Sequence, residues 1–398
     1  MDCKPLAVCI VSVIDHRGLT PKKLGGDWAK SGYRALSAKN IKDGKLVQTE
    51  SMKLVDEELY RRWMPQEIEE GDVFITSEAP FGEVLFWNSS EKLVLSQRVF
   101  GLKPNHNICD ARYLYYWMKG PLFQGELRGR ATGTTVIGLR QPELLKCGVA
   151  LPSMDTQKRI SAVLGAIDDK IESNAKLNGY LADVVDGLFE KALGQAEEKT
   201  LTDVVEILSG GTPKTKIGEY WEDGEIPFFG PGDANGSTYC LTTAKCITQL
   251  GLENCNSELY PVDTVFLTAR GTVGKVAMAA KPMAMNQSCF AFRGLGVSQP
   301  AVYQIIKRAV RSLKAKANGA TFAAINTRDL KIETILVPPD EELVAFEEEA
   351  ASLHSMMRAN EEESLKLSSL RDALLPKLMS GEIDVSEVDL TQLNSHLA

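Results

Sequence analysis

Residues 151–194 read LPSMDTQKRISAVLGAIDDKIESNAKLNGYLADVVDGLFEKALG, and their periodicity is the strongest structural signal in the sequence. From Ile160 to Leu188, apolar and amide side chains recur at alternating spacings of four and three. Such spacing is typical of a coiled-coil seam, here sustained over about four heptads. Pro152 stops the preceding segment, Asp155 is placed to cap the helix and Gly194 to end it. The stretch therefore predicts one long helix, in which positions 160–193 span roughly 50 Å at about 1.5 Å per residue.

A second long helix is predicted towards the C-terminus. The same spacing runs from Phe346 to Leu378, after the Pro338-Pro339 stop, with Asp340 as the expected cap and Gly381 at the end. Both segments are acidic: residues 155–199 hold 6 basic and 9 acidic side chains, and residues 340–363 hold 1 and 9.

The chain is an internal duplication. An offset of 186 places Pro152 on Pro338 and residues 131–136 on 317–322, an offset of 192 places 72–82 on 264–274, and an offset of 190 places 95–97 on 285–287. A period this long is far beyond that of a solenoid, so it predicts two copies of a globular domain followed by a helix. Short β-rich runs, glycine turns and one or two helices make each globular copy α+β.

These patterns predict domain boundaries. We expect a first globular domain at residues 1–154, a spacer helix at 155–199, a second globular domain at 200–339, a second helix at 340–381 and a tail at 382–398.

Composition narrows the class of protein. With 398 residues, 44% hydrophobic and 25% charged, the chain has the make-up of a soluble globular protein with ample core. The net charge of −8 excludes a uniformly basic nucleic-acid binder. However, residues 1–154 carry +3 (21 basic, 18 acidic) and residues 200–339 carry +2 (14 and 12), so the acidity lies on the helices and tail.

Neither a membrane segment nor a metal site is expected. The apolar run from Leu6 to Ile14 is too short to span a bilayer. The 8 cysteines form no Cys-x-x-Cys pair and only 4 histidines accompany them, which indicates reduced thiols in a cytoplasmic protein.

Catalytic motifs are missing from the sequence. A DNA methyltransferase needs a glycine-rich S-adenosylmethionine loop and an Asn/Asp-Pro-Pro-aromatic motif, and the nearest string, residues 336–340, lacks both the amide and the aromatic side chain. Gly271-Thr-Val-Gly-Lys275 is too short for a phosphate-binding loop and places no hydroxyl for Mg²⁺, so we interpret it as a hairpin turn. The chain is therefore expected to be no enzyme and to bind no cofactor itself.

A basic helix is predicted at residues 301–316. Its apolar face is opposed by Lys307, Arg308, Arg311, Lys314 and Lys316, and no acidic residue lies between Arg293 and Lys316. Two interpretations stay open, a solvated surface face and a face that binds a phosphate backbone.

The chain resembles the specificity subunits of type I restriction-modification systems over essentially its whole length. The resemblance rests on residues 151–160 with Asp168-Asp-Lys-Ile-Glu172, on Ser209-Gly-Gly-Thr-Pro213 with Tyr220-Trp221, on Asn286-Gln-Ser288, and on residues 370–376 with 380–382. The first copy departs from this pattern, because His16-Arg-Gly-Leu-Thr-Pro21 replaces the glycine pair and Ser96-Gln-Arg98 replaces Asn-Gln-Ser.

The resemblance implies an α+β fold with two similar target-recognition domains, held apart by a pair of long antiparallel helices. Each domain would read one half of a bipartite, asymmetric site on double-stranded DNA. The implied partners are two methyltransferase subunits, which bring S-adenosylmethionine, and optional restriction subunits, which use ATP and Mg²⁺. A helix of roughly 50 Å would separate the half-site centres by about 10 to 15 base pairs.

The predicted DNA contacts are polar and basic residues of the loops that flank the repeated anchors, since phosphate contacts position and base contacts specify. In the first domain they are Lys39, Asn40, Gln97, Arg98, Arg128, Arg130, Thr134 and Thr135. In the second they are Lys214, Lys216, Arg270, Gln287, Lys314, Lys316, Asn318 and Thr321.

Asn174 and Asn360 hold matching seam positions, and we expect them to pair and set the helix register. The alternative is that both face solvent.

Two alternative functions remain. One is a protein-interaction scaffold that binds no DNA, and the other is a nuclease that uses scattered acids such as Asp233 and Asp263. Because +5 over nearly 300 residues neutralises few phosphates, the isolated chain is expected to bind DNA weakly.

Overall fold

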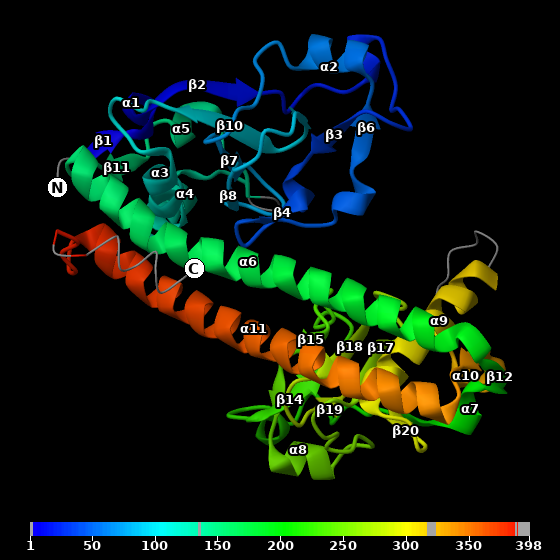
Figure 1. Ribbon diagram of the computed structural model, residues 1–398. Coiled ribbons are helices and arrows are strands. Elements are labelled where there is room, and N and C mark those ends of the chain that lie inside the picture. The colour runs from blue at the N-terminus through cyan, green and yellow to red at the C-terminus, as the bar shows by residue number, and fades with distance from the viewer. Residues whose placement is uncertain (1–2, 134–136, 317–323, 387, 389–398) are drawn as a thin grey trace. The chain divides into compact units, whose positions relative to one another are not determined.

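The computed structural model describes residues 3–133, 137–316, 324–386 and 388. The chain divides into two compact units, one formed by residues 1–170 and 367–398 and the other by residues 171–366 (Figure 1). Two long helices, α6 (Met154–Ala192) and α11 (Asp340–Ser380), contribute to both units. The predicted pair of long helices is therefore present.

The first unit is built on two small sheets. An antiparallel sheet has the order β2-β10-β7-β8, and a mixed sheet has the order β6-β3-β9, in which β3 and β9 are parallel. The strands of the two sheets are β2 (Ile10–Asp15), β10 (Val99–Pro104), β7 (Val73–Thr76), β8 (Val84–Phe86), β6 (Lys53–Val55), β3 (Tyr33–Leu36) and β9 (Leu93–Leu95). Two two-stranded pairs complete the sheets: β1 (Cys3–Pro5) with β11 (Gly148–Ala150), and β4 (Ile41–Lys42) with β5 (Lys45–Leu46).

The helices of this unit are short apart from α6 and α11. They are α1 (Leu6–Cys9), α2 (Glu57–Trp63), α3 (Ala111–Lys119), α4 (Pro121–Arg130) and α5 (Gln141–Leu144). Figure 1 shows α3 and α4 beside the N-terminal half of α6. Arg112 and Tyr116 of α3 bind this part of α6, through Asp169 and Asp168 respectively.

The second unit repeats this plan. Its antiparallel sheet has the order β13-β20-β17-β18, extended by β15, and its mixed sheet has the order β16-β14-β19 with β14 and β19 parallel. These strands are β13 (Val205–Ser209), β20 (Cys289–Gly294), β17 (Val265–Thr268), β18 (Val276–Ala279), β15 (Tyr239–Cys240), β16 (Cys246–Ile247), β14 (Ile226–Phe229) and β19 (Ala284–Met285). The pair β12 (Glu197–Thr200) and β21 (Thr334–Val337) corresponds to β1 and β11. Its shorter helices are α7 (Leu201–Val204), α8 (Gln249–Glu253), α9 (Gln299–Lys316) and α10 (Thr327–Ile332).

The main-chain hydrogen bonds of the two units match at the offsets seen in the sequence. Ser77 N donates to Arg98 O at 2.8 Å, and Ala269 N donates to Ser288 O at 2.8 Å. Leu139 N donates to Ser77 O at 3.0 Å, and Ile325 N donates to Ala269 O at 3.0 Å. The Thr76 hydroxyl accepts a hydrogen bond from Glu83 N at 2.9 Å, and the Thr268 hydroxyl accepts one from Lys275 N at 2.9 Å. In both units the donor lies seven residues after the threonine. The duplication is therefore a duplication of backbone geometry.

The predicted helix ends need correction. Helix α6 begins one residue before Asp155, and Ser153 Oγ accepts Thr156 N at 3.1 Å, so Ser153 acts as the cap and Asp155 instead binds Arg159. Gly194 lies in a short 3-10 turn at Leu193–Gln195 rather than in a left-handed cap. Gly381 does adopt a left-handed conformation, with φ of 77°, directly after α11.

The register prediction for the helix pair is also corrected. The Asn360 Nδ2 donates to Asn178 Oδ1 at 2.8 Å, whereas the Asn174 Nδ2 donates to Glu363 Oε2 at 2.7 Å and more weakly to Asn360 O at 3.4 Å. The Asn178 Nδ2 completes the set by donating to Met357 O at 3.0 Å. The two predicted asparagines thus lie at the seam, but their side chains do not pair with each other.

Among the described residues, no helix is both long and apolar enough to cross a membrane.

Candidate nucleic-acid interface

The loop that follows β7 and the loop that joins β9 to β10 meet at one edge of the first unit. They line an open cavity of about 320 Å³ together with the segment around Thr132–Arg140. Its lining comprises Arg17, Ser77, Glu78, Gln97, Arg98, Thr132, Gly138, Leu139 and Arg140. The structure therefore brings together Gln97 and Arg98, two of the predicted contacts, whereas Thr134 and Thr135 lie outside the described residues.

The arginines of this edge are held in defined positions. Arg17 makes two bonds to the Asp15 carboxylate, at 2.8 and 2.9 Å, stacks 3.9 Å above the Phe100 ring centre, and donates to Leu139 O at 3.0 Å. Arg98 lies 2.9 Å from Glu78, and its main chain adopts a left-handed φ of 67°. A guanidinium fixed by a carboxylate and a ring loses little freedom when it binds a phosphate or a guanine edge.

Equivalent loops in the second unit present different side chains. Arg270 follows the end of β17 by two residues, as Glu78 follows β7, and within the described chain Arg270 has no ion-pair partner. Ser288 occupies the position of Arg98, and Gln287 that of Gln97. The Thr212 hydroxyl donates to Gln287 Oε1, which ties the Gly210-Gly211 loop to this edge. Asn318 and Thr321 lie outside the described residues.

Asn40 has a structural role that corrects its assignment as a DNA contact. The side chain is fully buried; its Oδ1 accepts from Ser37 N at 3.2 Å and from the Ser37 hydroxyl at 2.7 Å, and its Nδ2 donates to Val47 O at 3.3 Å. Asp233 has a similar structural role in the second unit, where its carboxylate accepts hydrogen bonds from Gly230 N and Ala244 N, both at 2.8 Å. Both side chains shape their loops, which also leaves Asp233 a poor choice for a nuclease carboxylate.

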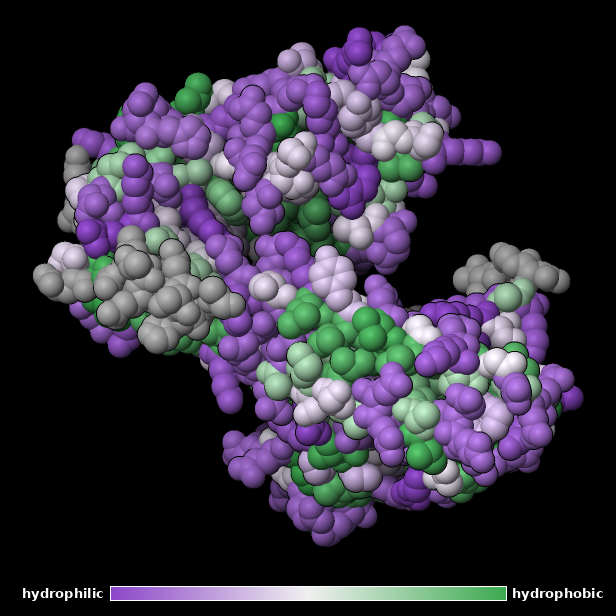
Figure 2. All heavy atoms as spheres, viewed as in Figure 1, coloured by the Kyte–Doolittle hydropathy of each residue, from purple (hydrophilic) through white to green (hydrophobic). Residues whose placement is uncertain are grey.

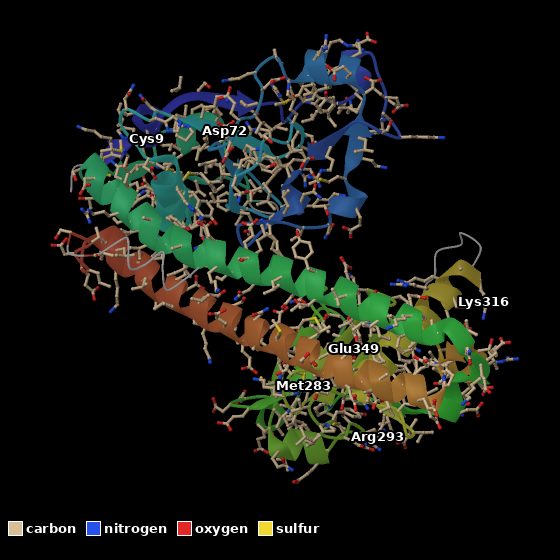
Figure 3. All side chains as sticks on the ribbon, in the orientation of Figure 1. Cys9, Asp72, Met283, Arg293, Lys316 and Glu349 are labelled. Atoms are coloured by element: carbon tan, nitrogen blue, oxygen red, sulfur yellow. The ribbon has the colours of Figure 1, made fainter. Side chains whose placement is uncertain are left out.

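Ion pairs already engage two other predicted contacts. Arg130 binds Glu126 at 2.8 Å and lies 3.5 Å from Glu143. Lys316, at the end of α9 (Figure 3), binds the buried Glu333 at 2.7 Å. The other predicted cations are exposed loop or helix-end side chains: Lys39, Arg128, Lys214, Lys216 and Lys314.

The basic face of α9 is neutralised from within the unit. Lys307 binds Asp186 at 2.6 Å, Arg308 binds Glu190 at 2.6 Å, and Arg311 lies 3.5 Å from Asp186. Burial opposes ionisation of Asp186, but hydrogen bonds from Lys307 and Gln304, with the nearby positive charges, lower its pKa below the ordinary value. The acids come from α6, over 100 residues away in sequence, so the part of this face from Lys307 to Arg311 is engaged by protein rather than free for a phosphate backbone.

Two residues of the edge were missed in the sequence, Arg17 and Arg140. Both stand near repeated anchors, Arg17 within the loop that replaces the glycine pair and Arg140 four residues after the 131–136 anchor. Their position near anchors was the available signal. Within the described residues, no group of three His, Cys, Asp or Glu side chains is placed to hold a metal ion.

A surface of a different kind lies on α6. Leu177, Tyr180 and Val184 share one helix face and are 40%, 69% and 51% exposed. Figure 2 shows hydrophobic side chains gathered over the stretch where α6 and α11 lie side by side. Large apolar side chains exposed in one stripe mark an interaction surface.

Comparison with known proteins places the chain in a family. The model of the type I restriction modification DNA specificity domain matches residues 14–181 and again residues 194–366. The type I restriction enzyme MjaIX specificity subunit of Methanocaldococcus jannaschii is 25% identical over 350 residues, 80% of this chain and 79% of that protein. The HindI specificity subunit of Haemophilus influenzae is 22% identical over 409 residues, 79% of this chain and 87% of that protein.

The fold has a counterpart among solved structures. The type I restriction-modification S subunit from M. genitalium superposes with a TM-score of 0.54 at 15% identity, over 95% of each chain. The family is named for DNA specificity rather than for catalysis. Two matches to one family model cover most of this chain, and the chain belongs to the family of type I restriction-modification DNA specificity subunits.

Proposed function

We propose that each unit reads one half of a bipartite, asymmetric DNA sequence through the loops at its strand ends. The observation that carries this proposal is the pair of equivalent edges with unlike side chains. Glu78 and Arg98 in the first unit correspond to Arg270 and Ser288 in the second, on matching main-chain hydrogen bonds. One backbone with two sets of polar groups suits two unlike half-sites, because direct readout depends on the donors and acceptors that reach base edges.

The proposed contacts are the exposed and half-buried polar side chains of each edge. In the first unit they are Arg17, Gln97, Arg98 and Arg140. Lys39 and Arg128, which lie close in sequence to the repeated anchors, are also included. In the second they are Arg270 and Gln287, with Lys214, Lys216 and Lys314 as phosphate contacts. Arg130 and Lys316 should contribute less, because Arg130 does not line the cavity and Lys316 binds the buried carboxylate of Glu333.

A loop exchange tests the division into half-sites. Residues 269–273 are replaced by residues 77–81, and N6-methyladenine is mapped in DNA modified by the chain together with its methyltransferase subunits. One half of the methylated sequence should change while the other half and the spacer stay the same. A change in both halves, or an undivided site, would contradict the proposal, and methylation or binding without sequence preference would favour a scaffold.

We further infer that the α6 stripe docks a methyltransferase subunit. Leu177, Tyr180 and Val184 present apolar surface on a rigid helix, which a partner helix can bury. Tyr180→Asp should weaken co-purification of the methyltransferase subunit strongly. Ala175→Asp adds the same charge on the opposite, exposed side of the helix and serves as the matched control. Equal assembly by both variants would rule this face out.

A further inference from the structure

The first unit contains a second cavity beside the proposed DNA-reading edge. It measures about 170 Å³ and shares Gln97 with that edge. An apolar cavity of about 150 Å³ in another protein accommodates one benzene molecule, so this cavity has room for a single planar ring system rather than a drug-sized ligand.

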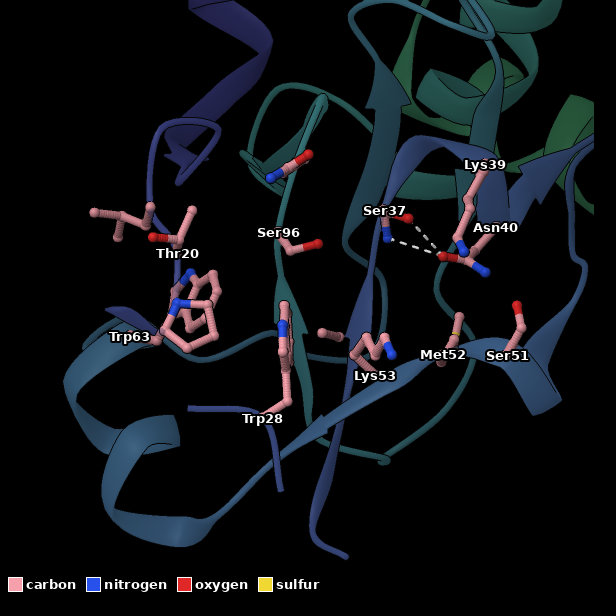
Figure 4. A pocket seen from close by; sticks show the side chains of 14 residues that line it. Thr20, Trp28, Ser37, Lys39, Asn40, Ser51, Met52, Lys53, Trp63 and Ser96 are labelled. Atoms are coloured by element: carbon pink, nitrogen blue, oxygen red, sulfur yellow. Dashed lines mark hydrogen bonds between the residues drawn. The ribbon is translucent and has the colours of Figure 1, made fainter. Parts of the chain in front are cut away.

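Aromatic and aliphatic side chains form one part of the wall. Trp28 and Trp63 lie with ring centres 6.2 Å apart at an angle of 38°, and Figure 4 shows them away from Ser37, Lys39 and Asn40 across the pocket. Trp63 is almost completely buried, whereas Trp28 is 41% exposed. The exposed indole offers a face on which a base can stack, and stacking on an aromatic ring accepts any of the four bases.

Some polar groups of the pocket have hydrogen-bond partners, such as Asn40 and Ser96, whereas four others have none in the part of the chain described. The buried Trp63 Nε1 has no hydrogen-bond acceptor in the described structure. The Gln97 amide and the Lys39 and Lys53 ammonium groups likewise lack a partner within the residues described. A buried indole N–H without an acceptor is costly, and a ligand with a carbonyl or ring nitrogen would satisfy it.

In the second unit, the equivalent groups are either bound to other residues of the protein or replaced. Trp221, at the position of Trp28, packs edge-on against Phe228 at 5.3 Å and donates its Nε1 to Lys214 O at 3.3 Å. Cys255 stands at the position of Trp63, seven residues after the cap of the equivalent helix, and Gln287 accepts from Thr212. The free stacking face, N–H donor and amide are therefore a property of the first unit.

We propose that this pocket binds a nucleotide, with the base against Trp28, a base acceptor at Trp63 Nε1 and the phosphate near Lys39 and Lys53. The nucleotide is either an unstacked base of the bound DNA or a free mononucleotide. The first source rests on the proposed DNA-reading function, whereas the second does not.

Two measurements distinguish these sources. In the first, 2-aminopurine is placed at each position of a cognate duplex bound to the chain with its methyltransferase subunits. One position in the first half-site should show a fluorescence change that Trp28→Ala abolishes. A base-flipping methyltransferase also unstacks its target base, so only a change that is lost in Trp28→Ala counts.

In the second, dAMP, dGMP, dCMP and TMP are titrated against the isolated chain by saturation-transfer NMR. Trp28→Ala should weaken binding by about five- to hundredfold through the lost base stack, and Lys53→Ala should weaken it by removing a positive charge near the phosphate. Lys45→Ala removes an exposed lysine of the same unit outside the pocket lining and should leave binding unchanged. Circular dichroism verifies folding of each variant, which the exposure of Trp28 favours.

The outcomes separate the two proposals. Mononucleotide binding without a 2-aminopurine change assigns the pocket to a free nucleotide. Sequence-specific DNA binding with neither signal overturns the pocket and leaves the reading function intact. Pocket binding of mononucleotides with no sequence preference on DNA overturns the reading function and leaves the pocket.

Discussion

Arg270 in the second unit occupies the backbone position that Glu78 occupies in the first, two residues beyond the end of an equivalent strand. Glu78 pairs with Arg98 at 2.9 Å, and Ser288, at the position of Arg98, offers Arg270 no counter-charge. The same site on the scaffold thus carries opposite charge in the two copies.

Arg270→Ala should therefore weaken binding of the assembled complex to its cognate site by about 1–3 kcal/mol, the range for one bidentate contact to a base edge. The effect on random DNA should be smaller. Titration of both duplexes by fluorescence anisotropy measures the difference, with Lys281→Ala in an exposed turn as control. Equal weakening on both duplexes would make Arg270 a phosphate contact.

The Asn178–Asn360 pair predicts coupling between two helices. Each single change to Ala should lower the free energy of unfolding by about 1 kcal/mol, because it leaves a partly buried amide without its partner. The double variant should lose little more than either single variant, which gives a coupling energy of about 0.5–1.5 kcal/mol in a double-mutant cycle. Chemical denaturation measures all four proteins, and strictly additive losses would show that the pair is not coupled.

His354 predicts an acid-sensitive second unit. Burial, with a smaller contribution from Lys307, lowers the pKa of His354 to about 4, and its Nδ1 lies 3.2 Å from the Tyr239 hydroxyl. Because the unfolded chain then binds the proton more readily than the folded chain, stability falls as the pH drops below about 6.5 towards 4. The loss between pH 7 and pH 5 should be about 2 kcal/mol.

Replacing the imidazole tests that origin. His354→Phe should remove most of this pH dependence in thermal denaturation of the chain, and His106→Gln, which changes an exposed histidine, should retain it. An unchanged pH profile in His354→Phe would place the acid sensitivity elsewhere.

Charge predicts weak DNA binding by the isolated chain. Residues 1–154 and 200–339 carry net charges of only +3 and +2, and three cations of α9 form ion pairs with Asp186 and Glu190. The slope of log K against log salt should therefore be shallower than about −5 and should steepen when methyltransferase subunits are added. Tight binding by the chain alone in high salt would contradict this.

The helices and the duplication were predictable because both depend on local periodicity or on self-similarity. The seam from Ile160 to Leu188 needs no partner to be visible in the sequence, and the repeated anchors carry the same backbone bonds in both copies. The stagger of two helices depends on how their side chains interlock, so the sequence could not indicate that Asn360 pairs with Asn178 rather than with Asn174.

Long-range charge pairing was equally invisible. The cations of α9 appear unbalanced until Asp186 and Glu190 are brought beside them by the fold. At the candidate site, the sequence located the loops. It could not separate side chains that bond within a loop, such as Asn40, from side chains that line the cavity, such as Gln97.

Several of the bonds that hold each proposed recognition loop join main chain to main chain, as between Leu139 and Ser77 or between Ile325 and Ala269. Such bonds are indifferent to the side chains between them. Mutation or recombination can therefore rewrite the loop sequences while the strands stay in register, and a protein of this construction can acquire a new DNA target without having to evolve a new fold.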